Sequence, residues 1–144
     1  MQKSTYLGDN TSGHPMFESI RTEIGEATYQ LKYRRDWTQA KPLAQAIADN
    51  VYPKLADVGF IVPMPASTQR VRQPVTEVAR ELGVLVKIPM IDNILEKAPK
   101  GPSLKNLDTK AEKVTAISNS FSVNDGIQND GQWNVLVVDD LFHT

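Results

Sequence analysis

The sequence predicts an α/β protein in which a parallel sheet is flanked by helices. Strand-like apolar runs alternate with helix-like stretches along the chain, which is the pattern of parallel α/β folds. The runs at 58–65 (VGFIVPMP), 84–91 (VLVKIPMI) and 134–139 (NVLVVD) are rich in aliphatic residues. Such runs are typical of strands covered on both faces. We therefore expect strands at 58–63, 84–91, 118–123 and 134–139.

The helices are predicted from apolar periodicity and from the residues at their ends. Thr38 can cap a helix in which Leu43, Ile47 and Val51 share one face. Gly83 is expected to stop the following helix, because glycine is the usual residue just past a helix end. The expected helices are 39–56, 74–82 and 103–116, and the weakly alternating stretch 26–34 is expected to be a strand or a hairpin arm.

Length and composition limit the kinds of protein this can be. A chain of 144 residues fits a single domain, 1–144, and its net charge of −1 gives no overall basic field for nucleic acid or an anionic membrane. The absence of cysteine excludes a disulfide framework and a thiolate zinc site, and two histidines are too few to indicate a metal centre. No apolar run approaches membrane-spanning length and the start lacks a signal segment, so we expect a soluble, cytoplasmic protein without a membrane partner.

Two adjacent carboxylates follow the last predicted strand. Asp139 and Asp140 come directly after Val135, Leu136, Val137 and Val138. In open parallel sheets, ligands bind beyond the carboxyl ends of the strands. Carboxylates placed there can accept hydrogen bonds from sugar hydroxyls or hold Mg²⁺. The alternative is that one aspartate caps a following helix and the other faces solvent.

The final segment, VLVVDDLFHT (135–144), resembles the ribose-phosphate signature of type I phosphoribosyltransferases. The resemblance extends to the ComF branch, the competence-associated phosphoribosyltransferase-like proteins. Three further segments are similar to that branch and occur in the same order: 31–36 (LKYRRD), 61–83 and 103–123. The resemblance implies a Rossmann-like, type I phosphoribosyltransferase-like sheet, with a variable N-terminal hood at about 1–30 and a core at 31–144.

The resemblance also implies an activity and a set of roles. Asp139 and Asp140 would contact the ribose hydroxyls of phosphoribosyl pyrophosphate as catalytic and substrate-binding residues. Mg²⁺ would enter with that substrate, bridging ribose and pyrophosphate. His143 and Thr144 would begin the loop around the 5′-phosphate, with histidine replacing the usual first threonine. The family's loop continues past the position of Thr144, so we expect that C-terminal strands are missing here.

Two further segments carry cations that suit a pyrophosphate. The turn at 63–74 contains Ser67, Thr68, Arg70 and Arg72 just before a predicted helix, where an anion is favoured. The alternative for that turn is a solvated basic loop.

The Pro-, Gly- and Lys-rich segment at 96–106 resembles the loop that closes over the reacting centre in this family. Lys97, Lys100 and Lys105 are its candidate contact residues. The alternative is an ordinary exposed linker.

The cluster 31–37 allows another interpretation. Lys32, Arg34 and Arg35 interleave with Tyr33 and Trp37, a combination that can bind single-stranded nucleic acid. The alternative is that the two aromatic side chains pack beneath the N-terminal layer.

Three functions therefore stay open. The first is a phosphoribosyltransferase that transfers the phosphoribosyl group to an unknown acceptor. The second is a non-catalytic regulator that binds a ribose phosphate or nucleotide. The third is an interaction module related to DNA uptake. A homodimer is compatible with each of the three.

Overall fold

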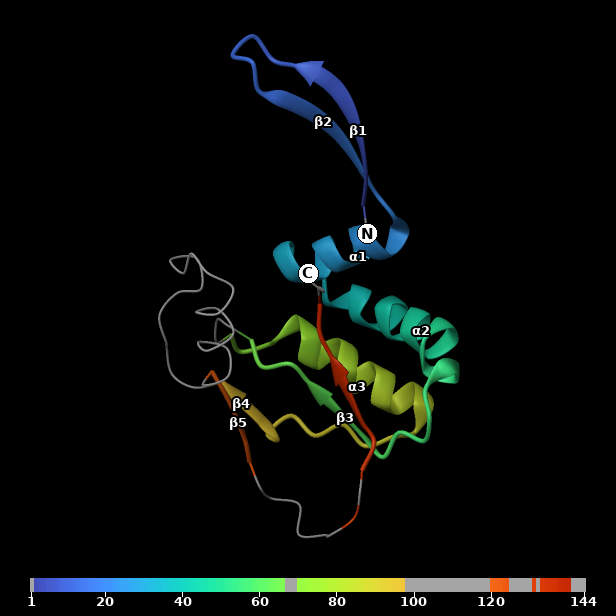
Figure 1. Cartoon of the computed structure of the whole chain (residues 1–144). Coiled ribbons are helices and arrows are strands. Elements are labelled where there is room, and N and C mark those ends of the chain that lie inside the picture. Colours follow the sequence, from blue (N-terminus) through green and yellow to red (C-terminus); the bar gives the residue numbers. More distant parts are fainter. Residues whose placement is uncertain (1, 67–69, 98–119, 125–130, 132, 141–144) are drawn as a thin grey trace.

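The computed structural model describes residues 2–66, 70–97, 120–124, 131 and 133–140. Within these residues the protein is mixed α/β, with helices and small two-stranded sheets (Figure 1). In chain order the elements are β1 (Gln2–Asp9), β2 (Pro15–Arg21), α1 (Glu23–Tyr33), the 3-10 helix η1 (Trp37–Gln39), α2 (Ala40–Asn50), the 3-10 helix η2 (Tyr52–Lys54), β3 (Phe60–Pro63), α3 (Pro74–Val86), β4 (Leu95–Lys97), β5 (Phe121–Val123) and β6 (Val135–Val138).

The strands β3 and β6 pair in parallel, as the alternation of strands and helices predicts. Their register runs from Phe60 opposite Val135 to Pro63 opposite Val138. On its other side β3 forms a single parallel bridge between Ile61 and Met90. The strand β3 is therefore central, and the described part of the parallel sheet is limited to this pair and that bridge.

The other two pairings are antiparallel. The strands β1 and β2 form a hairpin that extends away from the helical body (Figure 1). The short strands β4 and β5 pair from Leu95 opposite Val123 to Lys97 opposite Phe121. A strand is present at Phe121–Val123, within the expected 118–123, but it pairs antiparallel with β4, so the expectation that it belongs to the parallel sheet is wrong. The predicted helix at 103–116 lies outside the described residues.

The expectation of a strand or hairpin arm at 26–34 is wrong, because this stretch belongs to α1. The helix starts at the N-cap Thr22, whose hydroxyl accepts a hydrogen bond from the backbone N–H of Gly25. Glu23 and Glu26 occupy the first turn and Lys32 the last, which suits the helix dipole. The cap lies upstream of the alternating stretch, and only Leu31 of the helix is fully buried. Because the apolar face of α1 is weak, apolar periodicity did not predict this helix, although its N-cap is well formed.

The strand expected at 84–91 is also wrong, because α3 continues through Gly83 to Val86 and the rest of the stretch forms only the isolated bridge at Met90. The helix ends at Lys87, which has a φ of 58°. Beyond it, the Ile88 N–H donates back to the Gly83 carbonyl at 3.0 Å. A Cβ on Gly83 would lie 2.8 Å from the Ile88 carbonyl oxygen. Glycine is therefore needed at this position for close approach of the returning chain, and it does not stop the helix.

Helices α2 and α3 pack against each other and cover one face of the β3–β6 pair (Figure 1). The helix expected at 39–56 is divided into η1, α2 and η2, with breaks beside Ala40 and Val51. The buried cluster between helices and sheet consists of Leu31, Ala40, Leu43, Ala44, Ile61, Val78, Ala79, Leu82 and Val138. All four residues of β3 are buried, whereas Val135 and Val137 of β6 are exposed. The helices thus hold β3 and β6 in place from one side, and the two strands end at a common edge.

Candidate functional site

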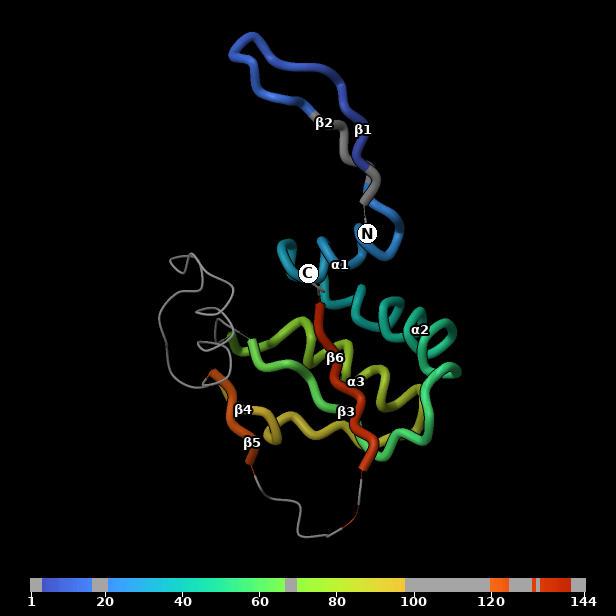
Figure 2. Tube along the Cα trace, viewed as in Figure 1, coloured from blue at the N-terminus to red at the C-terminus, as the bar shows by residue number. Residues whose placement is uncertain are grey.

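The common edge of β3 and β6 brings two distant segments together. Pro63 and Val138 are register partners, and the Met64 N–H donates to the Val138 carbonyl at 2.8 Å. Figure 2 shows β6 running beside β3, with its carboxyl end directed toward α1. The chain leaves β3 toward Arg70 and leaves β6 at Asp139 and Asp140. The acidic pair therefore lies at the carboxyl ends of parallel strands, where ligands bind in such sheets.

The two aspartates have different surroundings. Asp139 is exposed, and its Oδ1 accepts a hydrogen bond from the Asp140 N–H at 2.8 Å. The Asp140 carboxylate is 26% exposed, and its Oδ2 lies 2.6 Å from Nζ of Lys32, whose side chain is 33% exposed. Asp139 thus fixes the backbone at the strand end, while Asp140 holds a cation from α1. Each carboxylate has two oxygens with about four acceptor positions between them, so both keep further capacity for donors.

A cavity of about 400 Å³ lies beside this pair, among α1, α2, α3 and the end of β6. Its walls are mainly aliphatic, and its polar residues include Lys32, Asp139 and Asp140. The aliphatic lining residues are Ile24, Leu31, Leu43, Ala46, Ile47, Val51, Val75, Val78 and Val138. The volume lies in the range of small-molecule pockets. The charged groups are at the strand end, so a ligand there would meet an acidic and a basic group side by side.

The predicted basic turn divides between two environments. Nη1 of Arg70 donates to the Lys32 carbonyl at 3.4 Å, which ties the turn to the end of α1. Arg72 instead forms an ion pair with Glu77 at 2.6 Å, and its guanidinium lies 4.5 Å from the centre of the Trp37 ring. The second partner of Glu77 is Arg80, also at 2.6 Å. Hydrogen bonding from Arg72, supported by Arg80, lowers the pKa of Glu77 against the opposing effect of burial.

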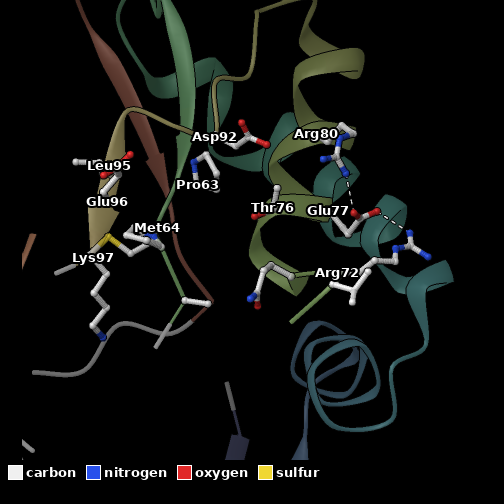
Figure 3. Close-up of a pocket in the computed structure, with 14 residues that line it drawn as sticks. Pro63, Met64, Arg72, Thr76, Glu77, Arg80, Asp92, Leu95, Glu96 and Lys97 are labelled. Atoms are coloured by element: carbon white, nitrogen blue, oxygen red, sulfur yellow. Dashed lines mark hydrogen bonds and ion pairs between the residues drawn. The ribbon is translucent and has the colours of Figure 1, made fainter. Parts of the chain in front are cut away.

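A second cavity, of about 520 Å³, contains Arg72 and Lys97 (Figure 3). Figure 3 shows Arg72, Glu77 and Arg80 on one wall and Leu95, Glu96 and Lys97 on the opposite wall. Its lining is largely polar and of mixed charge. The lysine Nζ of Lys97 also lies 5.7 Å from the centre of the Phe121 ring, across the β4–β5 pair.

The structure therefore separates the predicted site residues. Asp139 and Asp140 share the first cavity with Lys32, whereas Arg72 and Lys97 share the second. Among the residues that the structure describes, Arg70 is linked to the acidic pair through Lys32. The remaining candidates, Ser67, Thr68, Lys100, Lys105, His143 and Thr144, lie outside the described residues.

Lys32 is the site residue that the sequence did not indicate. The sequence placed it in a possible nucleic-acid cluster with Tyr33 and Trp37. In the structure Trp37 packs against the core while Tyr33 is 65% exposed, so the alternative that both aromatic side chains pack inside holds for Trp37 alone. A lysine in the last turn of a helix gives no local sign of a partner on β6, because that contact exists only after the sheet has assembled.

The acidic pair is compatible with magnesium brought by a substrate. Mg²⁺ is commonly held by one or two carboxylates together with substrate phosphates and waters. Asp139 and Asp140 supply two carboxylates at one strand end, and no group of three or more potential ligating side chains occurs in the described part of the chain. Asp139 and Asp140 are the residues that would hold such an ion.

No protein-family model, curated protein or solved structure matches this chain. Among the described residues no helix is long and apolar enough to cross a membrane.

Proposed function

We propose that this protein is a phosphoribosyltransferase that uses phosphoribosyl pyrophosphate with Mg²⁺ and transfers the phosphoribosyl group to an acceptor. The proposal includes a type I phosphoribosyltransferase-like fold of the ComF kind and a cytoplasmic location. The observation that carries it is the position of Asp139 and Asp140. Both follow a parallel strand, at the edge where the turn after β3 also leaves the sheet.

The chemistry of a phosphorylated ribose suits this position. Ribose hydroxyls donate hydrogen bonds, and Asp139 and Asp140 supply acceptors. Departure of pyrophosphate leaves a sugar with oxocarbenium-like positive charge, and adjacent carboxylates both orient the sugar and stabilise that charge. A bound Mg²⁺ would neutralise the pyrophosphate. The acceptor nitrogen or other nucleophile forms the new bond to the sugar as the bond to pyrophosphate breaks.

Binding can be tested by thermal unfolding of the full-length protein. A ligand that binds only the folded state stabilises it by about 2.7 kcal/mol at a hundredfold excess over Kd, which is several degrees in Tm. We expect phosphoribosyl pyrophosphate with Mg²⁺ to raise Tm, and Asp139→Asn with Asp140→Asn to abolish the shift. The matched control is Asp49→Asn with Asp57→Asn, which removes the same charge from exposed positions elsewhere. Equal shifts in the parent and in the Asp139/Asp140 variant would show that these carboxylates do not hold the ribose.

A second function is favoured by the contacts of the basic residues. Arg72 is already paired with Glu77 and stacked on Trp37, so the cation expected to bind pyrophosphate is held elsewhere. This arrangement suits a non-catalytic protein that binds a ribose phosphate or nucleotide. Release of pyrophosphate from phosphoribosyl pyrophosphate, with water as the acceptor, separates the two functions. Magnesium-dependent release that is lost in the Asp139/Asp140 variant supports the enzyme, and a Tm shift without release supports the binding protein.

A further inference from the structure

The ion pair between Lys32 and Asp140 joins the N-terminal helix to the acidic pair. At 2.6 Å it is a close contact, and both side chains are about one-third exposed or less. Partial burial makes such a pair stronger than a fully exposed one, because solvent screens it less. The same lysine lines the cavity that Asp139 and Asp140 line. Lys32 is thus positioned within reach of any ligand that contacts the two carboxylates.

Two interactions fix the position of the Lys32 backbone. Its own carbonyl accepts the hydrogen bond from Arg70, which links the end of α1 to the turn after β3. Lys32 is also in the last turn of α1, where a cation interacts favourably with the helix dipole. The backbone is therefore held at the site, while the four-carbon stem leaves the ammonium group able to move.

The charges explain what the lysine can do. Two adjacent carboxylates repel an anionic ligand and attract any divalent cation in solution. With Lys32 in contact with Asp140, the local charge of these three groups is −1 and the Asp140 carboxylate already holds a cation. A free metal ion must then compete with an ammonium group, whereas an anionic ligand meets less repulsion.

We propose that Lys32 is the built-in counter-ion of the acidic pair. It occupies the cation position at Asp140 in the absence of ligand, disfavours binding of a free divalent metal, and turns to the anionic part of a ligand that brings its own metal. This inference rests on the proposed function for the identity of the ligand, a phosphorylated sugar with Mg²⁺. The counter-ion role itself concerns the metal and Asp140 alone.

The test uses Lys32→Met, with Lys41→Met on the exposed surface of α2 as the control for the change in net charge. Binding of Mn²⁺ without ligand is followed from the loss of the free-ion electron paramagnetic resonance signal. Affinity for phosphoribosyl pyrophosphate with Mg²⁺ is measured by calorimetry. We expect Lys32→Met to raise the Mn²⁺ affinity roughly three- to tenfold and to lower the affinity for the anionic ligand by a similar factor, as removal of one partly buried charge implies. Lys32→Arg should keep both parental affinities.

Opposite changes in the two affinities distinguish a counter-ion from a structural ion pair. A lysine that only anchors α1 would, when replaced, leave the Mn²⁺ affinity unchanged or lower it, and either result overturns the proposal. So does a lack of Mn²⁺ binding by both parent and variant. Lys32→Gln provides a second variant if Lys32→Met does not fold. If the parent binds no phosphoribosyl pyrophosphate, the proposed function fails, while the Mn²⁺ titration still decides the role of Lys32.

Discussion

The β1–β2 hairpin and the β3–β6 pair are both two-stranded, but they are held together by different forces. The hairpin turn is fixed locally: Oδ1 of Asn10 accepts hydrogen bonds from the N–H groups of Ser12 and His14, and Gly13 has a φ of 75°. Its Tyr6 and Leu7 side chains are more than half exposed. The strand β3 instead has no exposed residue, and its partner β6 comes from a distant part of the chain.

This difference shows which features of the chain can be changed independently. Turn chemistry sets the register of the hairpin without help from the core. The parallel pair depends on burial against α2 and α3, because parallel strands have no local turn to hold them. Asp139 and Asp140 directly follow β6, so the position of the candidate site depends on the packing of β3 and β6 against the core and not on the hairpin.

The largest expected effect is in the buried strand. Ile61 is fully buried, so Ile61→Ala should lower the free energy of unfolding by about 2–5 kcal/mol through lost burial and a residual cavity. Urea denaturation measures the loss. Val137→Ala is the control in the same sheet: its side chain is 48% exposed, and it should cost less than about 1 kcal/mol. Similar losses in the two variants would contradict the assignment of β3 as the central strand.

A smaller effect should depend on pH through Glu77. Its pKa is lowered, chiefly by hydrogen bonding from Arg72, so the folded state favours the ionised form. The resulting stability is present above the ordinary glutamate pKa of about 4.3 and is lost as the pH falls through the lower folded-state value. Because both arginines are about half exposed, the contribution should be about 1 kcal/mol or less.

Urea midpoints between pH 7 and pH 3 test this expectation. The urea midpoint of the parent should exceed that of Glu77→Gln by the largest amount at pH 7. This difference in midpoint should shrink as the pH falls below about 4. Glu81→Gln changes the charge on the same helix without removing the Arg72 contact and serves as the control. A parent–variant difference that stays constant over this range would rule out the ionised Glu77 as its source.

The smallest effect on global stability is expected in the hairpin. Gly13→Ala meets no neighbouring atom within 4 Å, so its cost is the strain of a positive φ, about 1 kcal/mol. Because the hairpin extends away from the body, that strain should loosen β1 and β2 while the global unfolding free energy changes by less than about 0.5 kcal/mol.

Hydrogen exchange distinguishes local loosening of the hairpin from a change in global stability. Amides of 2–21 should lose protection in Gly13→Ala while those of α3 keep theirs, and the exposed turn variant Thr11→Ala should change neither. Loss of protection in α3 would mean that the hairpin supports the core, contrary to the comparison above.

Features that depend on neighbouring residues were predictable from the amino-acid pattern. Apolar runs located β3 and β6, and the terminal pattern of aliphatic residues placed Asp139 and Asp140 at a strand end. The helix expected at 74–82 does start at residue 74, the first residue of α3. These predictions succeed because strand burial and helix initiation are encoded within a few residues.

The contact between Lys32 and Asp140 depends instead on the packing of distant segments. Lys32 pairs with Asp140 because α1 packs beside the end of β6. The pair between Arg72 and Glu77 is, by contrast, local to the start of α3. Tertiary packing also explains why the strand expected at 84–91 is wrong. Leu85 and Val86 pack against the core from the end of α3. A short apolar run has the same composition in a buried helix end and in a buried strand, so the choice between them is made by what packs against it.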